Sequence, residues 1–154
     1  MKKLIGLLFL SQFFYAQQYK KVDFITCDAF VSPNFNDKSI SGKVNYEFKV
    51  LEKIDTISID AVAVDFSDVR INYKKVPFVY DGKHLKLYKG FKKKDNVLSF
   101  TYSAKPKQTL YFVGDEQDFQ IWTQGQGKFT SHWLPSFDDV NEKVIFNLKI
   151  NSKS

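Results

Sequence analysis

The sequence predicts an all-β protein, built as an antiparallel β-sandwich or an open barrel. Apolar and polar residues alternate with a period of two along most of the chain, the pattern of half-buried strands. No stretch shows the 3.6-residue period of an amphipathic helix. The composition agrees, because 17% of the 154 residues are aromatic and aromatic side chains favour strands. Short strands separated by turn signals are typical of a sandwich.

The expected strands follow one another closely along a single domain. In 43–50, Lys-Val-Asn-Tyr-Glu-Phe-Lys-Val, every second residue is apolar. Asp81-Gly82 lies between two alternating runs and indicates a tight hairpin. Asp95-Asn96 predicts a turn before the strand that begins at Val97. The expected strands span residues 43–50, 56–60, 62–66, 69–71, 76–80, 85–87, 97–102, 110–113, 119–123 and 144–150.

The first 16 residues resemble a secretory signal peptide. Lys2 and Lys3 precede an apolar run at 4–10, and the small residue Ala16 offers a cleavage site before Gln17. We therefore expect residues 1–16 to be removed and 17–154 to form the mature domain, exported to the periplasm or outside the cell. The apolar run is shorter than a membrane span, so we expect no stable membrane anchor after cleavage.

Several function classes are disfavoured by residue types. Cys27 is the one cysteine, which excludes an intramolecular disulfide and a cysteine-rich metal site. The two histidines, His84 and His132, lie too far apart for a His-Glu-x-x-His zinc motif, so we expect no metal site in this chain. The lysines at 83–94 are interpreted as a solvated hairpin tip that protects strand edges. We expect no nucleic acid partner.

The segment 121–143 differs from the rest of the chain. After a strand that ends at Thr123, Gln124 and Gln126 alternate with Gly125 and Gly127. Glycine allows a positive φ or a close backbone approach, and a loop with neutral donors and acceptors on a rigid sheet can hold a polar ligand group. The alternative is that both amides satisfy backbone groups within a turn.

This segment resembles the N-terminal β domain of the M1 (gluzincin) zinc aminopeptidases. The resemblance rests on Thr123-Gln124-Gly125-Gln126 and on Trp133-Leu134-Pro135-Ser136-Phe137-Asp138 with Lys143. The family pattern has Cys where this chain has Ser136 and Pro where it has Val140. Weaker similarity in the upstream strands extends the match over nearly all of 17–154. The resemblance implies a saddle-like sheet, and a chain that stops before the domain and its catalytic partner are complete.

The resemblance implies roles for the two glutamines. Gln126 would contact the α-amino group of a peptide N-terminus, and Gln124 would shape the first side-chain pocket. An ammonium group offers three donors and no acceptor, so it needs oxygen atoms around it, and a Gln carbonyl supplies one. A Gln at the second position is similar to the aminopeptidase B and leukotriene A4 hydrolase branch.

The other residues of the block are expected to be structural. Trp133, Pro135 and Phe137 would pack the loop onto the sheet, and Asp138 would accept hydrogen bonds from nearby amides. Gly125 would allow the bend, Lys143 completes the family pattern, and His132 is expected to be an ordinary polar loop residue.

The resemblance also implies that catalysis takes place elsewhere. The family's zinc motif is absent from this sequence, so Zn²⁺ is expected in a missing catalytic domain and this chain alone is predicted to be inactive. A peptide N-terminus would be a partner only when such a domain is joined to it. The alternatives are a stand-alone exported β-sandwich that binds a ligand without catalysis, and a non-functional remnant whose open edge at 144–150 invites association.

Overall fold

The computed structural model describes residues 18–115, 117–125 and 128–151. They form three sheets and a single short α-helix, α1 (Gln18–Lys21). The large sheet has six strands in the order β11-β1-β2-β8-β4-β5, and the smaller sheets have the orders β3-β7-β6 and β10-β9. The predicted all-β class is confirmed. The strands are β1 (Val22–Asn34), β2 (Ser39–Val50), β3 (Ile57–Asp60), β4 (Val64–Ile71), β5 (Lys74–Lys75), β6 (Phe78–Tyr80), β7 (His84–Leu87), β8 (Lys94–Ala104), β9 (Leu110–Gly114), β10 (Phe119–Thr123) and β11 (Ile145–Ile150).

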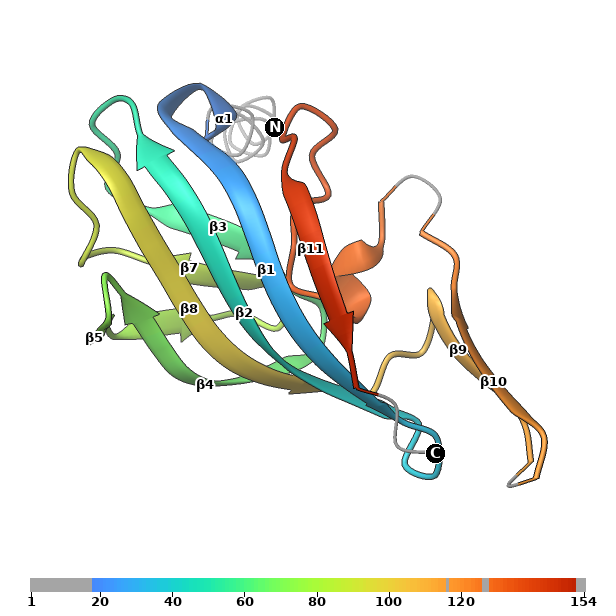
Figure 1. Ribbon diagram of the computed structural model, residues 1–154. Helices are drawn as coiled ribbons and strands as arrows, with labels where there is room; N and C mark the ends of the chain where they lie inside the picture. The colour runs from blue at the N-terminus through green and yellow to red at the C-terminus, as the bar shows by residue number, and fades with distance from the viewer. Residues whose placement is uncertain (1–17, 116, 126–127, 152–154) are drawn as a thin grey trace, which may run out of the picture.

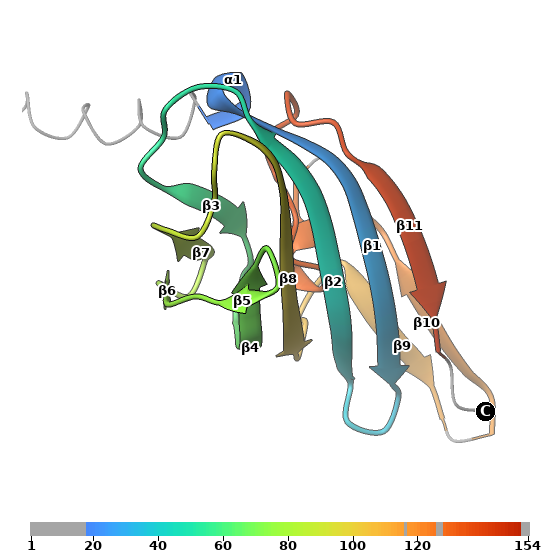
Figure 2. The same cartoon turned by 60° about the vertical axis from the view of Figure 1, so that its left-hand side comes forward.

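The large sheet is strongly curved, and the sheet β3-β7-β6 lies on its concave side (Figures 1 and 2). The core fills the space between them. Its largest fully buried side chains include Phe24, Tyr46, Phe48 and Phe100 from the large sheet and Ile57, Ile59, Leu85 and Leu87 from the small one. Burial of these apolar side chains is the main driving force for the fold.

The strand β1 was not expected from the sequence. Its register to β2 shifts between Phe24 and Thr26, where the two strands form a bulge or irregularity. A bulge inserts one extra residue and moves the following side chains to the other face. The alternation therefore breaks after Phe24 and resumes at Cys27, which hides a strand of 13 residues from a search for a strict period of two.

The sheet is mixed rather than wholly antiparallel, since β11 pairs with β1 in parallel, with Cys27 opposite Phe146. Alternation predicts that a strand exists but not its direction, which depends on how the preceding connection returns. The expected turn at Asp95-Asn96 is also wrong, because both residues lie within β8. Gly82, in contrast, has a φ of 87° in the predicted turn between β6 and β7.

The ribbon β9–β10 extends to one side of the body, next to the end of the molecule that carries the turn between β1 and β2 (Figure 1). Tyr111 and Trp122 stack on one another across the ribbon with ring centroids 4.4 Å apart. Phe119 stacks on Phe35 of the β1–β2 turn at 4.7 Å. Within the described residues, no helix is both long and apolar enough to cross a membrane.

Candidate functional site

The loop that follows β10 is held at its base by Thr109. The Thr109 carbonyl accepts hydrogen bonds from the Thr123 hydroxyl at 2.6 Å and from the Gln124 backbone N–H at 3.0 Å. The Thr109 hydroxyl donates to the carbonyl of Phe129 at 3.0 Å. Thr109 is buried, with a φ of 69°. One residue therefore joins both ends of the loop 124–128, so its base is fixed.

Gln124 is exposed to solvent beyond this base. A Cβ atom placed on Gly125 would lie 3.3 Å from the Thr130 hydroxyl oxygen, which is a tight contact, so a small residue fits best there. Gln126 and Gly127 lie outside the described residues.

The segment after the loop lies across both main sheets. A 3₁₀ helix at Thr130–His132 leads into 133–138, where Trp133, Leu134 and Pro135 are buried. The backbone of Ser136 exchanges two hydrogen bonds with Asp60 at the end of β3, each 2.9 Å long. The Tyr46 hydroxyl donates to the Pro135 carbonyl at 2.7 Å. These contacts fix the path of the chain beneath the loop.

Phe137 packs against two aromatic side chains of the large sheet, which also contact each other. Its ring centroid lies 4.4 Å from that of Phe24 and 5.6 Å from that of Tyr46. Lys143, also expected to be structural, is exposed just before β11. The ring of His132 lies 3.1 Å from the Gln108 amide nitrogen. The described part of the chain has no group of three or more His, Cys, Asp or Glu residues that could hold a metal ion.

Asp138 differs from the sequence expectation. Its carboxylate accepts a hydrogen bond from the Ser131 hydroxyl at 2.8 Å, whereas its own N–H donates to Asp60 Oδ2 at 2.7 Å. The Asp138 backbone amide is therefore the donor to the Asp60 carboxylate, and the Asp138 carboxylate accepts from a hydroxyl group. Burial raises the pKa of Asp60, and the hydrogen bond from the Asp138 amide opposes that rise.

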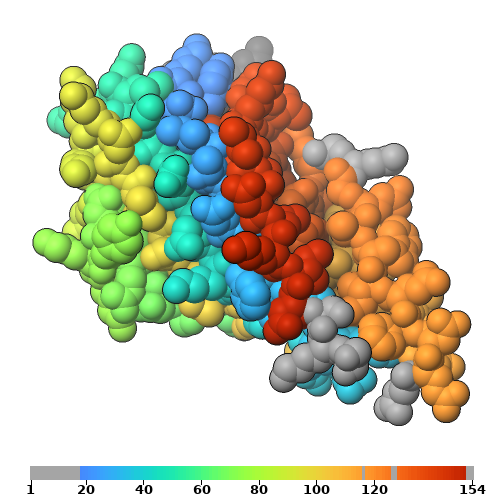
Figure 3. All heavy atoms as spheres, in the orientation of Figure 1, coloured from blue at the N-terminus to red at the C-terminus, as the bar shows by residue number. Residues whose placement is uncertain are grey.

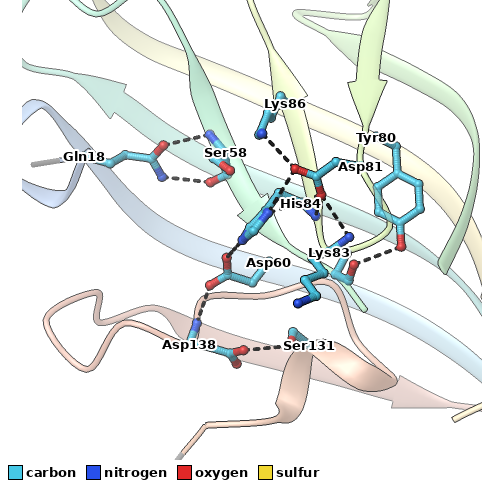
Figure 4. A network of polar contacts seen from close by, with 11 residues as sticks. Gln18, Ser58, Asp60, Tyr80, Asp81, Lys83, His84, Lys86, Ser131 and Asp138 are labelled. Carbon is cyan, nitrogen blue, oxygen red and sulfur yellow. Dashed lines mark hydrogen bonds and ion pairs between the residues drawn. The ribbon is translucent and has the colours of Figure 1, made fainter. Parts of the chain in front are cut away.

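Asp60 belongs to a polar network that sequence reasoning missed (Figure 4). The network consists of Asp60, Asp81, His84, Lys86 and Asp138. His84 lies between two carboxylates, with Nε2 3.7 Å from Asp60 Oδ1 and Nδ1 3.2 Å from Asp81 Oδ2. Lys86 Nζ lies 2.7 Å from Asp81 Oδ2 and is the largest cause of a strongly lowered Asp81 pKa. A polar residue at the end of the buried strand β3 was the only signal for this network.

A cleft of about 860 Å³ opens beside the network. Its wall contains Glu142, whose carboxylate accepts a hydrogen bond from the Phe24 N–H at 3.1 Å. Burial raises the pKa of Glu142 to about 7. Lys128, at the end of the loop 124–128, lines the cleft, whereas Gln124 does not. Other residues that line it are Tyr19, Ile54, Asp60, Tyr88 and Asp139.

Comparison with family models matched residues 17–154 to the Peptidase M1 N-terminal domain. Comparison with curated protein sequences found no match. Among solved structures, leukotriene A4 hydrolase from Saccharomyces cerevisiae in complex with bestatin is 23% identical and superposes with a TM-score of 0.78, covering 88% of this chain and 24% of that one. The M1 zinc metallopeptidase from Deinococcus radiodurans is 14% identical, with a TM-score of 0.73 and coverage of 86% and 33%.

A mutant of the Deinococcus radiodurans peptidase bound to a Tyr-Ser-Ala substrate is similar to the same extent, at 15% identity and a TM-score of 0.73. At such identities the likeness establishes a shared fold. The chain spans about a quarter to a third of the length of these structures, with coverage of 24% and 33%.

Proposed function

Because this chain belongs to the Peptidase M1 N-terminal domain family, we propose that it recognises the free α-amino group of a peptide for a zinc aminopeptidase. The observation that carries the proposal is the fixed base of the loop at Thr109, from which Gln124 extends into solvent. An ammonium group donates three hydrogen bonds and accepts none. Carbonyl oxygens on a rigid loop meet that demand without a buried charge.

The roles divide between the two glutamines as follows. Gln126 accepts a hydrogen bond from the α-ammonium group, and Gln124 borders the pocket for the first side chain. A rigid base lowers the entropic cost of holding these groups in place. Solved structures that share this fold are zinc metallopeptidases, and the proposal places the metal and the hydrolytic chemistry in another part of the peptidase. That part must face the loop for the two halves to act on one substrate.

The proposal predicts that replacing Gln126 weakens substrate binding more than it slows chemistry. In a full-length M1 peptidase with the same Thr-Gln-Gly-Gln loop, a Gln→Ala change at the position of Gln126 raises KM roughly 10- to 100-fold, because a hydrogen bond to a charged group contributes about 1.5–3 kcal/mol. Steady-state kinetics on an aminoacyl-anilide substrate measure this change. The matched control replaces the residue at the position of Gln120, which is exposed on β10 four residues before Gln124.

A second measurement separates amine recognition from a general loosening of the loop. A bound peptide and its des-amino analogue differ in the ammonium group alone. If the ammonium group contacts the Gln126 side chain, its removal lowers the affinity strongly in the wild type and only slightly in the Gln126→Ala variant. Equal costs in both proteins would remove Gln126 from the site. Unchanged kinetics would likewise remove Gln126 from the site.

We also propose that the chain is exported. The basic start, the apolar run and Ala16 support this, although all lie before the described residues. An aminopeptidase domain outside the cytoplasm would act on peptides of the periplasm or the medium.

A further inference from the structure

The positive charge of the protein gathers in one part of the chain. Residues 70–94 contain nine Lys and Arg residues and a single acidic residue, Asp81, whereas the whole chain has 23 basic and 17 acidic residues. The remainder of the chain is therefore slightly acidic. Such a separation gives the molecule a basic side with a strong local potential.

The fold brings two lysine-bearing turns of this region together. One is the turn between β4 and β5 at 72–73, and the other is the connection from β7 to β8 at 88–93. They lie side by side on the left of Figures 1 and 3. We call this surface the basic end. It consists of Tyr73, Lys74, Lys75, Lys89, Lys92, Lys93 and Lys94.

Two asparagine side chains hold the turns of the basic end in place. Asn72 donates from Nδ2 to the Gly90 carbonyl at 3.3 Å and to Asn96 Oδ1 at 3.0 Å. Asn96 is buried, and its amide accepts from the Lys92 N–H and donates to the carbonyls of Lys92 and Lys94 at 2.8–2.9 Å. This network keeps the lysines close together although their like charges repel each other.

Few carboxylates neutralise the lysines. Lys75 lies 3.7 Å from Asp68, but its side chain is 74% exposed. All of the lysines of the basic end are exposed. Within the part of the chain that the structure describes, no ion pair with a carboxylate forms at Lys74, Lys89, Lys92, Lys93 or Lys94. These charges are therefore available to an anionic partner.

One tyrosine and one leucine side chain lie among the lysines. Tyr73 is 79% exposed at the tip of its turn. Leu51 is half exposed and lines a shallow pocket with Lys49, Lys93, Lys94 and one carboxylate, that of Asp95. Tyrosine favours the boundary between lipid headgroups and hydrocarbon. Single-stranded nucleic acid, in contrast, calls for a groove with stacked aromatic rings, and these groups lie on turn tips.

We propose that the basic end binds the surface of an anionic lipid bilayer. The lysines supply reversible electrostatic attraction, and Tyr73 enters the headgroup layer. The ribbon β9–β10 lies on the opposite side of the molecule (Figure 1), so it stays open to solution when the basic end faces the membrane. The proposal does not depend on the peptidase function.

The test uses the 154-residue chain with a fluorescent dye at one of two positions. Cys27 is buried, so a dye that senses polarity attaches to an introduced cysteine, Lys75→Cys in the basic end or Lys107→Cys away from it. Vesicles of phosphatidylcholine with phosphatidylglycerol should shift the emission of the first dye to the blue and leave the second unchanged. Pure phosphatidylcholine vesicles or high salt should abolish the shift.

Charge variants link this contact to the lysines. Lys89→Gln with Lys92→Gln and Lys93→Gln should raise the lipid concentration for half-maximal shift roughly 100-fold, since each lysine contributes about fivefold. The matched control removes the same charge away from the basic end, by Lys43→Gln, Lys105→Gln and Lys107→Gln in the Lys75→Cys background. Its lower net charge alone should raise the lipid concentration for half-maximal shift about threefold or less. Arginine at 89, 92 and 93 keeps the charge and should retain binding even if the glutamine variant is less stable.

Three outcomes would overturn the proposal. In the first, the two glutamine variants raise the lipid concentration for half-maximal shift by the same factor. In the second, neutral vesicles shift the emission as strongly as anionic ones. In the third, the emission of the dye at position 107 shifts as much as that of the dye at position 75. Tighter binding of a single-stranded oligonucleotide, lost in the same variant, would assign the basic end to nucleic acid instead.

Discussion

Two buried tyrosines on neighbouring strands differ in what their hydroxyl groups contact. Tyr46 donates to the Pro135 carbonyl at 2.7 Å. The hydroxyl of Tyr102 is equally buried and has no hydrogen-bond partner among the described residues. An unsatisfied buried polar group costs free energy, whereas a satisfied one contributes to stability. The pair therefore offers a comparison in which ring packing is kept and only the hydrogen bond differs.

We expect Tyr46→Phe to lower the free energy of unfolding by about 1–3 kcal/mol, because the Pro135 carbonyl loses its partner. Tyr102→Phe should be neutral or slightly stabilising, since it removes a desolvated hydroxyl. Urea titrations followed by circular dichroism measure both. Equal destabilisation by the two changes would show that the bond to Pro135 adds nothing to the attachment of the loop segment.

Glu142 makes stability depend on pH near neutrality. Burial raises the pKa of its carboxyl from 4.5 to about 7. The folded state therefore binds a proton that the unfolded state releases between these values, so this contribution to stability is full below pH 4.5 and is lost as pH rises through 7. The carboxyl is only half-buried, which reduces the effect to about 1–2 kcal/mol.

Glu142→Gln should flatten this part of the profile. The amide keeps an oxygen for the Phe24 N–H but does not titrate. Melting temperatures measured from acidic to alkaline pH should converge for wild type and variant in acid, and the variant should be the more stable above pH 7. A wild-type profile with no decline in this range would assign Glu142 an ordinary pKa.

Individual residues of the site were predictable only where the signal was local. The Asp81-Gly82 turn follows from adjacent residues. The partners of Glu142 and Pro135 lie 118 and 89 positions away along the chain, and no short pattern encodes such contacts. Asp60 and His84 were missed for the same reason, since the network forms only when β3, β7 and the segment 131–138 meet.

At the level of elements, β11 combines an apolar sequence with little cover. Leu148 lies opposite Ala29 in the parallel register and therefore points to the same face as the buried side of β1. Its side chain is nevertheless 44% exposed. An edge strand with uncovered apolar side chains favours association with other chains. The sequence predicted this strand and its open edge, but not its parallel direction or its partner β1.

Leu148→Lys should therefore reduce concentration-dependent association of the protein without a large loss of stability. The side chain is half exposed, so its contribution to the core is partial. Analytical ultracentrifugation over a range of concentrations measures the effect. Ile145→Lys, on the other face of the same strand, is the control and should change association less. If both variants associate like the wild type, β11 is not the contact surface.

At the scale of the whole molecule, the fold class and most strands followed from periodicity alone, because a half-buried strand marks every second residue. The family followed from one block of residues at 122–143. The layers and the bulged strand β1 could not be predicted, since they depend on pairings between distant segments. The separation of charge was visible in the sequence, but the two asparagines that hold the lysines together were not.

Processing of the chain also concerns the whole molecule. The sequence predicts that residues 1–16 are removed as a signal peptide. The described core and hydrogen bonds join residues 18–151 to one another, so removal of 1–16 should leave this fold intact. In a secreting bacterial host, the exported protein should begin at Gln17, as measured by intact mass and N-terminal sequencing. Ala16→Phe should block cleavage, because the position before the cut requires a small side chain, whereas Gln17→Glu, after the cut, should be processed normally. A protein that is retained inside the cell and still begins at Met1 would contradict the signal peptide.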